Sequence, residues 1–245
     1  LKEALLKNSL IGIPFAHQQI GKVHLKQGDL LEALEQFLIA QEKYKATQNW
    51  VEIALNNILI GDVYANTGDL LRAENEFNKC KEIGEKINNN TLISTGFLAL
   101  FDIETNQKNP AASAILKKAT YFIGQIESKD LKAAFYSFIG HRKQNTYNYN
   151  EAVFFYKKSI VLSQLTNNIE ALVETYYKAG KVKEKLKLFT EAKAYYVNGF
   201  EAAKNNSYLL GIKIGCLKLS TFYEARGDYK NSSIYLKYLN KIKTL

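Results

Sequence analysis

Residues 21–40 read GKVHLKQGDLLEALEQFLIA, and residues 61–80 read GDVYANTGDLLRAENEFNKC. Both segments begin with Gly, carry Gly-Asp-Leu-Leu from the eighth position, and place Ala at the thirteenth position and Phe at the seventeenth. On each side of the Gly-Asp pair, apolar residues recur at spacings of three and four, which is typical of an amphipathic helix. Each segment therefore predicts two helices joined by a tight turn.

The same pattern continues along the chain at a nearly constant interval. The position of Ala33 recurs forty residues later as Ala73, and its further equivalents are Ala112, Ala152, Ala192 and Ser232. Gly recurs in this register at 21, 61, 140 and 180, and an aromatic residue at 37, 77, 156 and 196. The small residues predict close helix contact and the aromatic residues fill the space between repeats. A fixed period indicates stacked repeats, because one hairpin cannot bury its apolar face alone.

The turns inside the hairpins carry a recurring signature of their own. Gly28, Gly68 and Gly227 can adopt the left-handed backbone conformation that ends a helix. An Asp follows each of these glycines, at 29, 69 and 228, and its carboxylate can cap the amides that open the next helix. In the third hairpin Asn109-Pro110 takes this place, with Asn as the cap and Pro at the first helical position.

This pattern of Gly, Tyr, Ala and aromatic positions resembles the tetratricopeptide repeat (TPR) family, in its forty-residue variety. The resemblance implies an all-α fold, a right-handed superhelix of about six helix-turn-helix repeats that forms a single continuous solenoid. The expected divisions are the tail of a preceding truncated repeat with its turn at 1–13, and repeats at 14–53, 54–92, 93–132, 133–172, 173–212 and 213–245, the third of them degenerate.

Composition and charge narrow the function classes. With 47% hydrophobic and 23% charged residues and only 2 prolines, the chain has the balance of a globular helical protein. It contains no apolar run of membrane-spanning length, so we expect no membrane insertion by this segment. The compartment stays open: cytoplasmic, or periplasmic if the parent protein is a membrane-anchored sensor. The net charge of +9 favours an acidic partner.

The sequence offers no constellation for catalysis. His17, His24 and His141 have no metal-ligand spacing, Cys80 and Cys216 stand far apart, and no Gly-rich phosphate loop occurs. Five lysines crowd one segment at 178, 181, 183, 185 and 187, but spacings of two and three wrap them around a helix instead of lining one face. We therefore expect no enzyme, metal or cofactor, and no nucleic-acid binding by this segment.

The resemblance also implies where a ligand binds. In the family, the first helix of each repeat lines a concave groove, and aromatic and amide side chains there suit an extended peptide. The matching residues of this chain are Lys22, Lys26, Asp62, Asn66, Phe97, Phe101, His141, Gln144, Asn145, Tyr177, Lys181 and Lys185. Phe97 and Phe101 fit equally well as core residues of the degenerate repeat. A carboxylate clamp of the chaperone-tail type is not expected, because its positions hold Gln18, Asp62, Phe101 and Ser137.

The function expected from this resemblance is non-catalytic binding of a protein or peptide. The chain is similar to the sensory or regulatory TPR arrays of larger bacterial signal-transduction or transcription-regulating proteins. Two alternatives stay open: an intracellular receptor for a signalling peptide, and a passive assembly scaffold that acts through its convex face. A homodimer joined through the solenoid ends is compatible with each of them.

Overall fold

The computed structural model describes residues 2–243, with side chains from residue 12 to residue 242. Within that range the chain forms twelve α-helices and no strand. Their bounds are α1 (Lys2–Gln27), α2 (Leu30–Ala46), α3 (Trp50–Thr67), α4 (Leu70–Lys86), α5 (Asn90–Asn106), α6 (Ala111–Gln125), α7 (Lys129–Asn145), α8 (Tyr149–Leu165), α9 (Ile169–Lys185), α10 (Phe189–Asn205), α11 (Leu209–Glu224) and α12 (Tyr229–Lys243). The all-α fold of helix-turn-helix repeats is confirmed.

The helices divide into two compact units where the sequence predicted one continuous domain. Unit 1 covers residues 1–126 and contains α1 to α6, and unit 2 covers residues 127–245 and contains α7 to α12. The other helix connections each contain a residue with positive φ, whereas the division falls at extended backbone, with ψ of 134° at Ile126 and 114° at Ser128. The tight turn that stacks one hairpin on the next is therefore missing at this junction.

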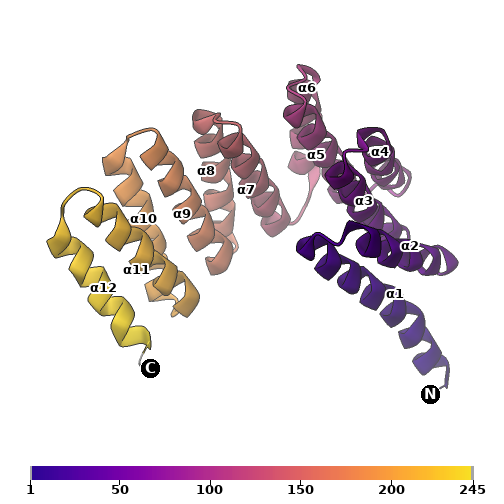
Figure 1. Ribbon diagram of the computed structural model, residues 1–245, viewed down its shortest axis with the longest axis horizontal. Helices are drawn as coiled ribbons and strands as arrows, with labels where there is room; N and C mark the ends of the chain where they lie inside the picture. The colour runs from indigo at the N-terminus through magenta and orange to yellow at the C-terminus, as the bar shows by residue number, and fades with distance from the viewer. Residues whose placement is uncertain (1, 244–245) are drawn as a thin grey trace. The chain divides into compact units, whose positions relative to one another are not determined.

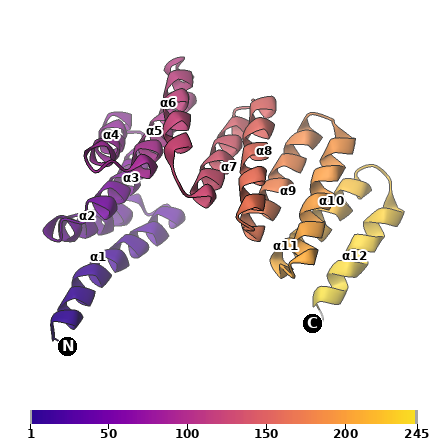
Figure 2. The same ribbon diagram turned by 180° about the vertical axis from the view of Figure 1, so that it is seen from behind.

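Within each unit, successive helices pack side by side in chain order, as Figure 1 shows and Figure 2 shows from behind. The odd-numbered helices also contact one another, α1 with α3 and α3 with α5 in unit 1, and α7 with α9 and α9 with α11 in unit 2. The first helices of the hairpins thus form one layer in each unit, and this layer carries the candidate site described below.

The recurring glycines and aromatic residues form the contact inside each hairpin. A Cβ atom at Gly180 would lie 2.6 Å from Cε1 of Tyr196, and one at Gly21 would lie 2.6 Å from Cε1 of Phe37. The aromatic ring therefore rests directly on the glycine of its own hairpin. The same rings reach the next hairpin, since the centroids of Tyr196 and Phe222 are 5.8 Å apart. One aromatic residue thus links two repeats.

A left-handed residue marks nearly every turn. The three predicted glycines have φ of 90° (Gly28), 84° (Gly68) and 73° (Gly227), which confirms the prediction. In the other hairpins the same position also has positive φ but is not glycine, so these turns were not predicted from the sequence. The residues are Lys108, Tyr147 and Lys187. The turns between hairpins use Gln48, Asn88, Asn167 and Ser207 in the same way.

Two of the three aspartate caps form. Asp69 Oδ1 accepts from the amide of Arg72 at 3.1 Å, and Asp228 Oδ1 accepts from the amide of Asn231 at 3.1 Å. The prediction for Asp29 is wrong, because its side chain makes no capping hydrogen bond and lies 3.5 Å from His24 Nδ1 instead. Asn109 Oδ1 accepts from the amide of Ala111 at 3.0 Å, but the N-cap residue of α6 is Pro110, so the prediction of Asn as the cap and Pro at the first helical position is wrong by one residue.

The start of the chain differs from the expected layout. Helix α1 runs without interruption from Lys2 to Gln27, so the turn predicted within residues 1–13 is absent from the described backbone. Pro14 lies inside this helix, where it removes one backbone hydrogen bond without ending the helix. The later hairpins begin three or four residues before the expected repeat starts, for example at Trp50 against 54 and at Asn90 against 93.

Candidate functional site

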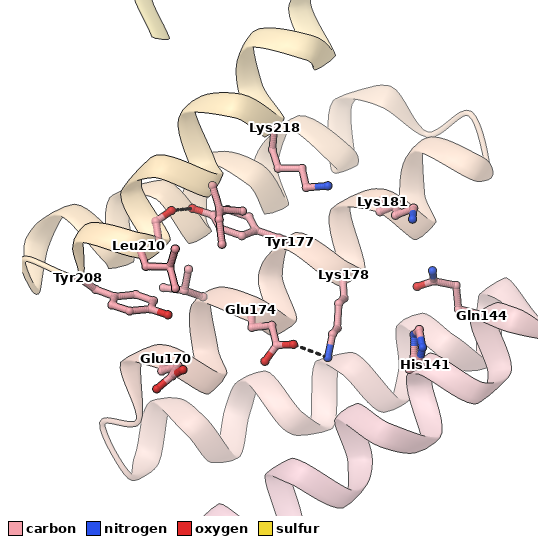
Figure 3. A pocket seen from close by; sticks show the side chains of 13 residues that line it. His141, Gln144, Glu170, Glu174, Tyr177, Lys178, Lys181, Tyr208, Leu210 and Lys218 are labelled. Atoms are coloured by element: carbon pink, nitrogen blue, oxygen red, sulfur yellow. Dashed lines mark hydrogen bonds and ion pairs between the residues drawn. The ribbon is translucent and has the colours of Figure 1, made fainter. Parts of the chain in front are cut away.

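A pocket of about 490 Å³ opens in unit 2 between α7, α9 and α11 (Figure 3). Helix α7 contributes His141 and Gln144, and α9 contributes the central row from Glu170 to Lys181. The start of α11 and the turn before it close the other side. The complete lining is His141, Gln144, Glu170, Val173, Glu174, Tyr177, Lys178, Lys181, Tyr208, Leu210, Gly211, Ile214 and Lys218.

Tyr177 forms the floor of the pocket. Its side chain is 5% exposed, and its hydroxyl donates a 2.9 Å hydrogen bond to the backbone carbonyl of Gly211 on α11. Two glycines make room for the ring: a Cβ at Gly199 would lie 2.6 Å from Cε1, and one at Gly215 would collide with the hydroxyl. Burial raises the pKa of Tyr177, so the phenol stays neutral and remains a donor. The floor is therefore rigid and largely apolar.

One wall of the pocket carries an internal ion pair. Glu174 Oε1 lies 2.9 Å from the ammonium of Lys178, one helical turn along α9. The same ammonium donates to Ser137 Oγ on α7 at 3.4 Å. These two charges largely neutralise each other, and their hydrogen bonds connect α9 to α7.

The other charged side chains separate by sign, as Figure 3 shows. Lys181 and Lys218 lie on the side of Tyr177 that faces away from Glu170, and Glu170 lies near Tyr208. Among the described residues, Lys181, Lys218 and Glu170 make no ion pair or hydrogen bond through their side chains. The pocket thus has a basic end, defined by Lys181 and Lys218, and an acidic end, defined by Glu170.

Titratable groups in the pocket respond to this field. The pKa of His141 is lowered by burial and then by the positive charges of Lys178, Arg142 and Lys181, which makes the imidazole neutral near pH 7. The pKa of Tyr208 is raised by burial and by the negative charges of Glu170 and Glu174. Both shifts agree with the separation of positive and negative charge in the pocket.

A second hollow of about 270 Å³ continues along the same helices. It lies between α7, α8 and α9 and shares three lining residues with the first pocket: His141, Glu174 and Lys178. Its other walls are mainly small side chains, including Ala133, Ala134 and Ala171. The concave surface of unit 2 is therefore longer than the deep pocket alone.

Of the six predicted site residues in unit 2, four line the pocket and two do not. His141, Gln144, Tyr177 and Lys181 line the pocket. Asn145 lies one turn from His141, with Nδ2 at 3.4 Å from Nε2 of the imidazole. Lys185 is exposed at the end of α9 and is not among the lining residues. Gln144 is partly held by its own hairpin, because its Oε1 accepts from the hydroxyl of Tyr156 at 3.0 Å.

The predicted aromatic residues of unit 1 lie in the core. Phe101 is 2% exposed and Phe97 is 9% exposed, so both rings are buried in unit 1. The ring of Phe97 stacks on Phe122 of α6 at a centroid distance of 5.9 Å, and the ammonium groups of Lys81 and Lys118 lie 5.6 and 6.0 Å from its centroid. The expectation that these rings line a groove is therefore corrected, and their alternative assignment as core residues of the third hairpin holds.

The polar residues predicted in unit 1 stand on α1 and α3. Lys22 Nζ donates to Gln18 Oε1 at 3.4 Å, and Asn66 Nδ2 donates to the backbone carbonyl of Asp62 at 2.7 Å. Lys26 is exposed at the end of α1. A binding role for these residues stays a prediction, whereas the pocket described above is built within unit 2 alone.

Several lining residues lie outside the set expected from the sequence: Glu170, Val173, Glu174 and Lys178 on α9, Tyr208 in the turn before α11, and Leu210, Gly211, Ile214 and Lys218 on α11. Lys218 follows Ile214 by four positions and therefore shares its helix face, a signal that was available in the sequence. Tyr208 lies in the turn before α11, where helical periodicity gives no guidance.

The comparisons with known proteins agree with this architecture. The tetratricopeptide repeat model matches residues 56–85 and 173–206. These two segments are tetratricopeptide repeats. The second of them contains Tyr177, Lys178 and Lys181 of the pocket, and the match confirms the resemblance drawn from the Gly and Ala positions. No curated protein sequence matches the chain significantly.

Solved structures of TPR-like proteins share the fold at low sequence identity. A signal transduction ATPase with numerous domains, which has a tetratricopeptide repeat sensor and comes from Pyrococcus horikoshii, is 19% identical with a TM-score of 0.64 over 94% of this chain. The match covers 36% of that protein, so this chain spans about a third of its length. A Rap protein complexed with competence and sporulation factor is 16% identical, with a TM-score of 0.55 over 95% of this chain and 75% of that one.

A third solved structure is the Rap conjugation gene regulator of plasmid pLS20 in complex with the Phr* peptide. It is 16% identical, with a TM-score of 0.55 over 100% of this chain and 76% of that one. At these identities the matches establish the fold. Within the described part of the chain, none of the helices has the length and apolarity needed to cross a bilayer, and no group of His, Cys, Asp and Glu is arranged to hold a metal ion.

Proposed function

We propose that this chain is a non-catalytic peptide-binding module and that the pocket between α7, α9 and α11 is its binding site. In this account the module is the sensory or regulatory part of a larger signal-transduction protein. The observation that carries the proposal is a pocket with a rigid aromatic floor at Tyr177 and charged side chains at both ends that have no partner among the described residues.

The size and chemistry of the pocket suit a short stretch of peptide. A volume of about 490 Å³ falls within the usual range for ligand sites, which hold mostly apolar surface and a few convergent polar groups. Val173, Leu210 and Ile214 supply apolar contacts for a side chain. The amide of Gln144 can bond a peptide backbone, which is a common feature of peptide recognition.

The similar structures support this assignment by analogy. Two of them are described as complexes, one with competence and sporulation factor and one with the Phr* peptide, and a third contains a repeat sensor. A shared fold alone does not fix function, so the weight of the proposal rests on the pocket.

Both cysteines lack the character of a catalytic nucleophile. Burial raises the pKa of the Cys80 thiol to about 12 and that of Cys216 to about 11. A thiol must ionise to attack, so neither group is reactive near neutral pH. In the second hollow, the hydroxyl of Ser137 accepts a hydrogen bond from Lys178.

A peptide selection with matched variants tests the proposal. Leu210 lines the pocket and is 57% exposed, while its neighbour Leu209 is 50% exposed and lies outside the lining. Tryptophan at either position is tolerated by folding because both side chains face solvent. Peptides selected from a displayed random library on the wild-type chain should bind Leu209→Trp unchanged and Leu210→Trp at least about tenfold more weakly.

The result can contradict the proposal in two ways. Failure of the wild-type chain to enrich any peptide would remove peptide binding as its function. Equal binding of the selected peptides to Leu210→Trp and Leu209→Trp would move the binding site away from this pocket.

A further inference from the structure

We infer that the pocket selects its peptide by charge at both ends: an acidic group at Lys181 and Lys218, an apolar side chain at the centre, and a basic group at Glu170. This inference rests on the proposed function and specifies its ligand class. The observation that carries it is the separation of unpaired charges of opposite sign on the two sides of Tyr177 (Figure 3).

The basic end exists because nearby acidic groups are already engaged. Glu184 follows Lys181 by three positions on α9, which is a favourable spacing for an ion pair. Its carboxylate is instead held by the hydroxyl of Tyr196 at 2.6 Å and the guanidinium of Arg226 at 3.2 Å. Arg226 is fixed in turn between the rings of Phe189 and Phe222, at 4.0 and 3.7 Å from their centroids. Lys181 therefore makes no ion pair with Glu184.

Lys218 lacks an acidic neighbour for a simpler reason. The residues three and four positions away on α11 are Ile214, Gly215, Thr221 and Phe222, none of which carries a charge. Glu174 on α9 is neutralised by Lys178 at 2.9 Å. Two ammonium groups from different helices therefore line the pocket without an acidic partner, and each can donate a charge-assisted hydrogen bond to an anionic group of a ligand.

The acidic end has the opposite arrangement. Glu170 lies in the first turn of α9, and the residues three and four positions on are Val173 and Glu174, so no cation on its own helix faces it. On the other side of the pocket, the nearest residues are Tyr208, in the turn before α11, and Leu210, at the start of α11. Burial, and then the negative charges of Glu170 and Glu174, raise the pKa of the Tyr208 phenol. A cationic group of a ligand would be stabilised at this end.

Between the two ends lie apolar side chains on α9 and α11, namely Val173, Leu210 and Ile214. The ligand that fits this order is a short peptide with an apolar residue flanked by opposite charges. The acidic group can be an Asp or Glu side chain or a free carboxyl terminus, and the basic group can be Lys, Arg or a free amino terminus. Both sources offer the same chemistry to the pocket.

Charge reversal at each end tests the inference. Displayed random peptides would be selected separately on the wild-type chain, on Lys181→Glu/Lys218→Glu and on Glu170→Lys. Peptides selected on the double variant should contain fewer acidic residues than those selected on the wild type. Peptides selected on Glu170→Lys should contain fewer basic residues. Peptides selected on the wild type should bind either variant about tenfold more weakly or worse, as measured by fluorescence anisotropy.

Matched controls separate a local effect from a change in net charge. Lys157→Glu on α8 and Glu201→Lys on α10 reverse exposed charges outside the pocket, and they should leave both selection and affinity unchanged. Unaltered far-ultraviolet circular dichroism and melting temperature should accompany every variant. Repeating the measurement with carboxyl-amidated and amino-acetylated peptides shows whether terminal or side-chain groups supply the charges.

The outcomes distinguish charge selection by the pocket from the proposed peptide binding on which it rests. Selected peptides that lose affinity for Leu210→Trp but keep the same charge preference on the reversed variants would overturn the charge selection and leave peptide binding intact. Absence of any selected peptide on the wild-type chain would overturn the proposed function and the inference with it. A reversed charge preference of the selected peptides at each end would support both charge selection and peptide binding.

Discussion

The hydroxyl of Tyr177 on α9 donates a 2.9 Å hydrogen bond to the backbone carbonyl of Gly211 on α11. This contact joins the first helices of two successive hairpins beneath the pocket floor. Because the ring also packs on Gly199 and Gly215, one side chain ties together α9, α10 and α11. The shape of the pocket therefore depends on the same residue that holds these hairpins in register.

Removal of this hydroxyl should lower stability moderately. Tyr177→Phe keeps the ring contacts and loses one buried hydrogen bond, which we expect to cost about 1 kcal/mol in the free energy of unfolding. Urea denaturation followed by circular dichroism measures it. Tyr147→Phe is the control, since Tyr147 is 79% exposed and its loss should change stability by less than about 0.5 kcal/mol. Equal effects of the two substitutions would contradict the role assigned to Tyr177.

The glycines inside the hairpins should not tolerate a methyl group. Gly180→Ala places a Cβ 2.6 Å from Cε1 of Tyr196, and we expect this overpacking to destabilise the fold by roughly 1–3 kcal/mol. At Gly124 on α6 no atom lies within 4 Å of the same position, so Gly124→Ala should stabilise by about 0.5 kcal/mol through helix propensity. Thermal melting of both variants checks the opposite signs.

The left-handed turn residues with side chains are sites where glycine should help. Lys187 has φ of 60°, a conformation that costs a residue with Cβ about 1 kcal/mol. Lys187→Gly should therefore raise the melting temperature, whereas Lys185→Gly, at the end of helix α9, should lower it. A fall in melting temperature for Lys187→Gly would show that its side chain contributes more than the backbone strain costs.

Alkaline pH should unfold the protein before its core tyrosines ionise. Burial raises the pKa of Tyr44 to about 12 and that of Tyr156, Tyr177 and Tyr196 further still. Because the folded-state pKa is raised, the stabilisation is complete below the unfolded value of about 10 and is lost as pH rises above it. A pH titration that follows tyrosinate absorbance and circular dichroism together should show a late, cooperative step. Ionisation of these tyrosines with the helices intact would contradict their burial.

The sequence predicted the helices well because each hairpin repeats local signals. Gly28, Gly68 and Gly227 revealed three turns, and the Gly and Ala positions revealed helix contacts through their small size. The division of the chain at Ile126 was not predictable from the repeat, since the third hairpin keeps its period while the following turn changes its backbone conformation. A period reports spacing along the chain and does not report the backbone conformation of each connection.

The candidate site was predictable in part. The resemblance to the repeat family placed His141, Gln144 and Lys181 on the first helices of their hairpins, and all three line the pocket. It failed for Phe101, which is 2% exposed, because burial depends on tertiary packing that a residue's place in the repeat does not contain. The unpaired state of Lys181 also depends on tertiary contacts, since Glu184 is occupied by Tyr196 and by Arg226 from beyond α11.

Methyl NMR of unit 2 tests the central claim most directly. A peptide selected on the wild-type chain would be titrated while the methyl resonances of two groups are followed: Val173, Leu210 and Ile214, which line the pocket, and Val161 and Leu165, which are exposed on α8 outside it. The account predicts shifts in the first group and none in the second. Shifts confined to Val161 and Leu165, with the pocket methyls unmoved, would contradict it and favour a scaffold that binds through its other face.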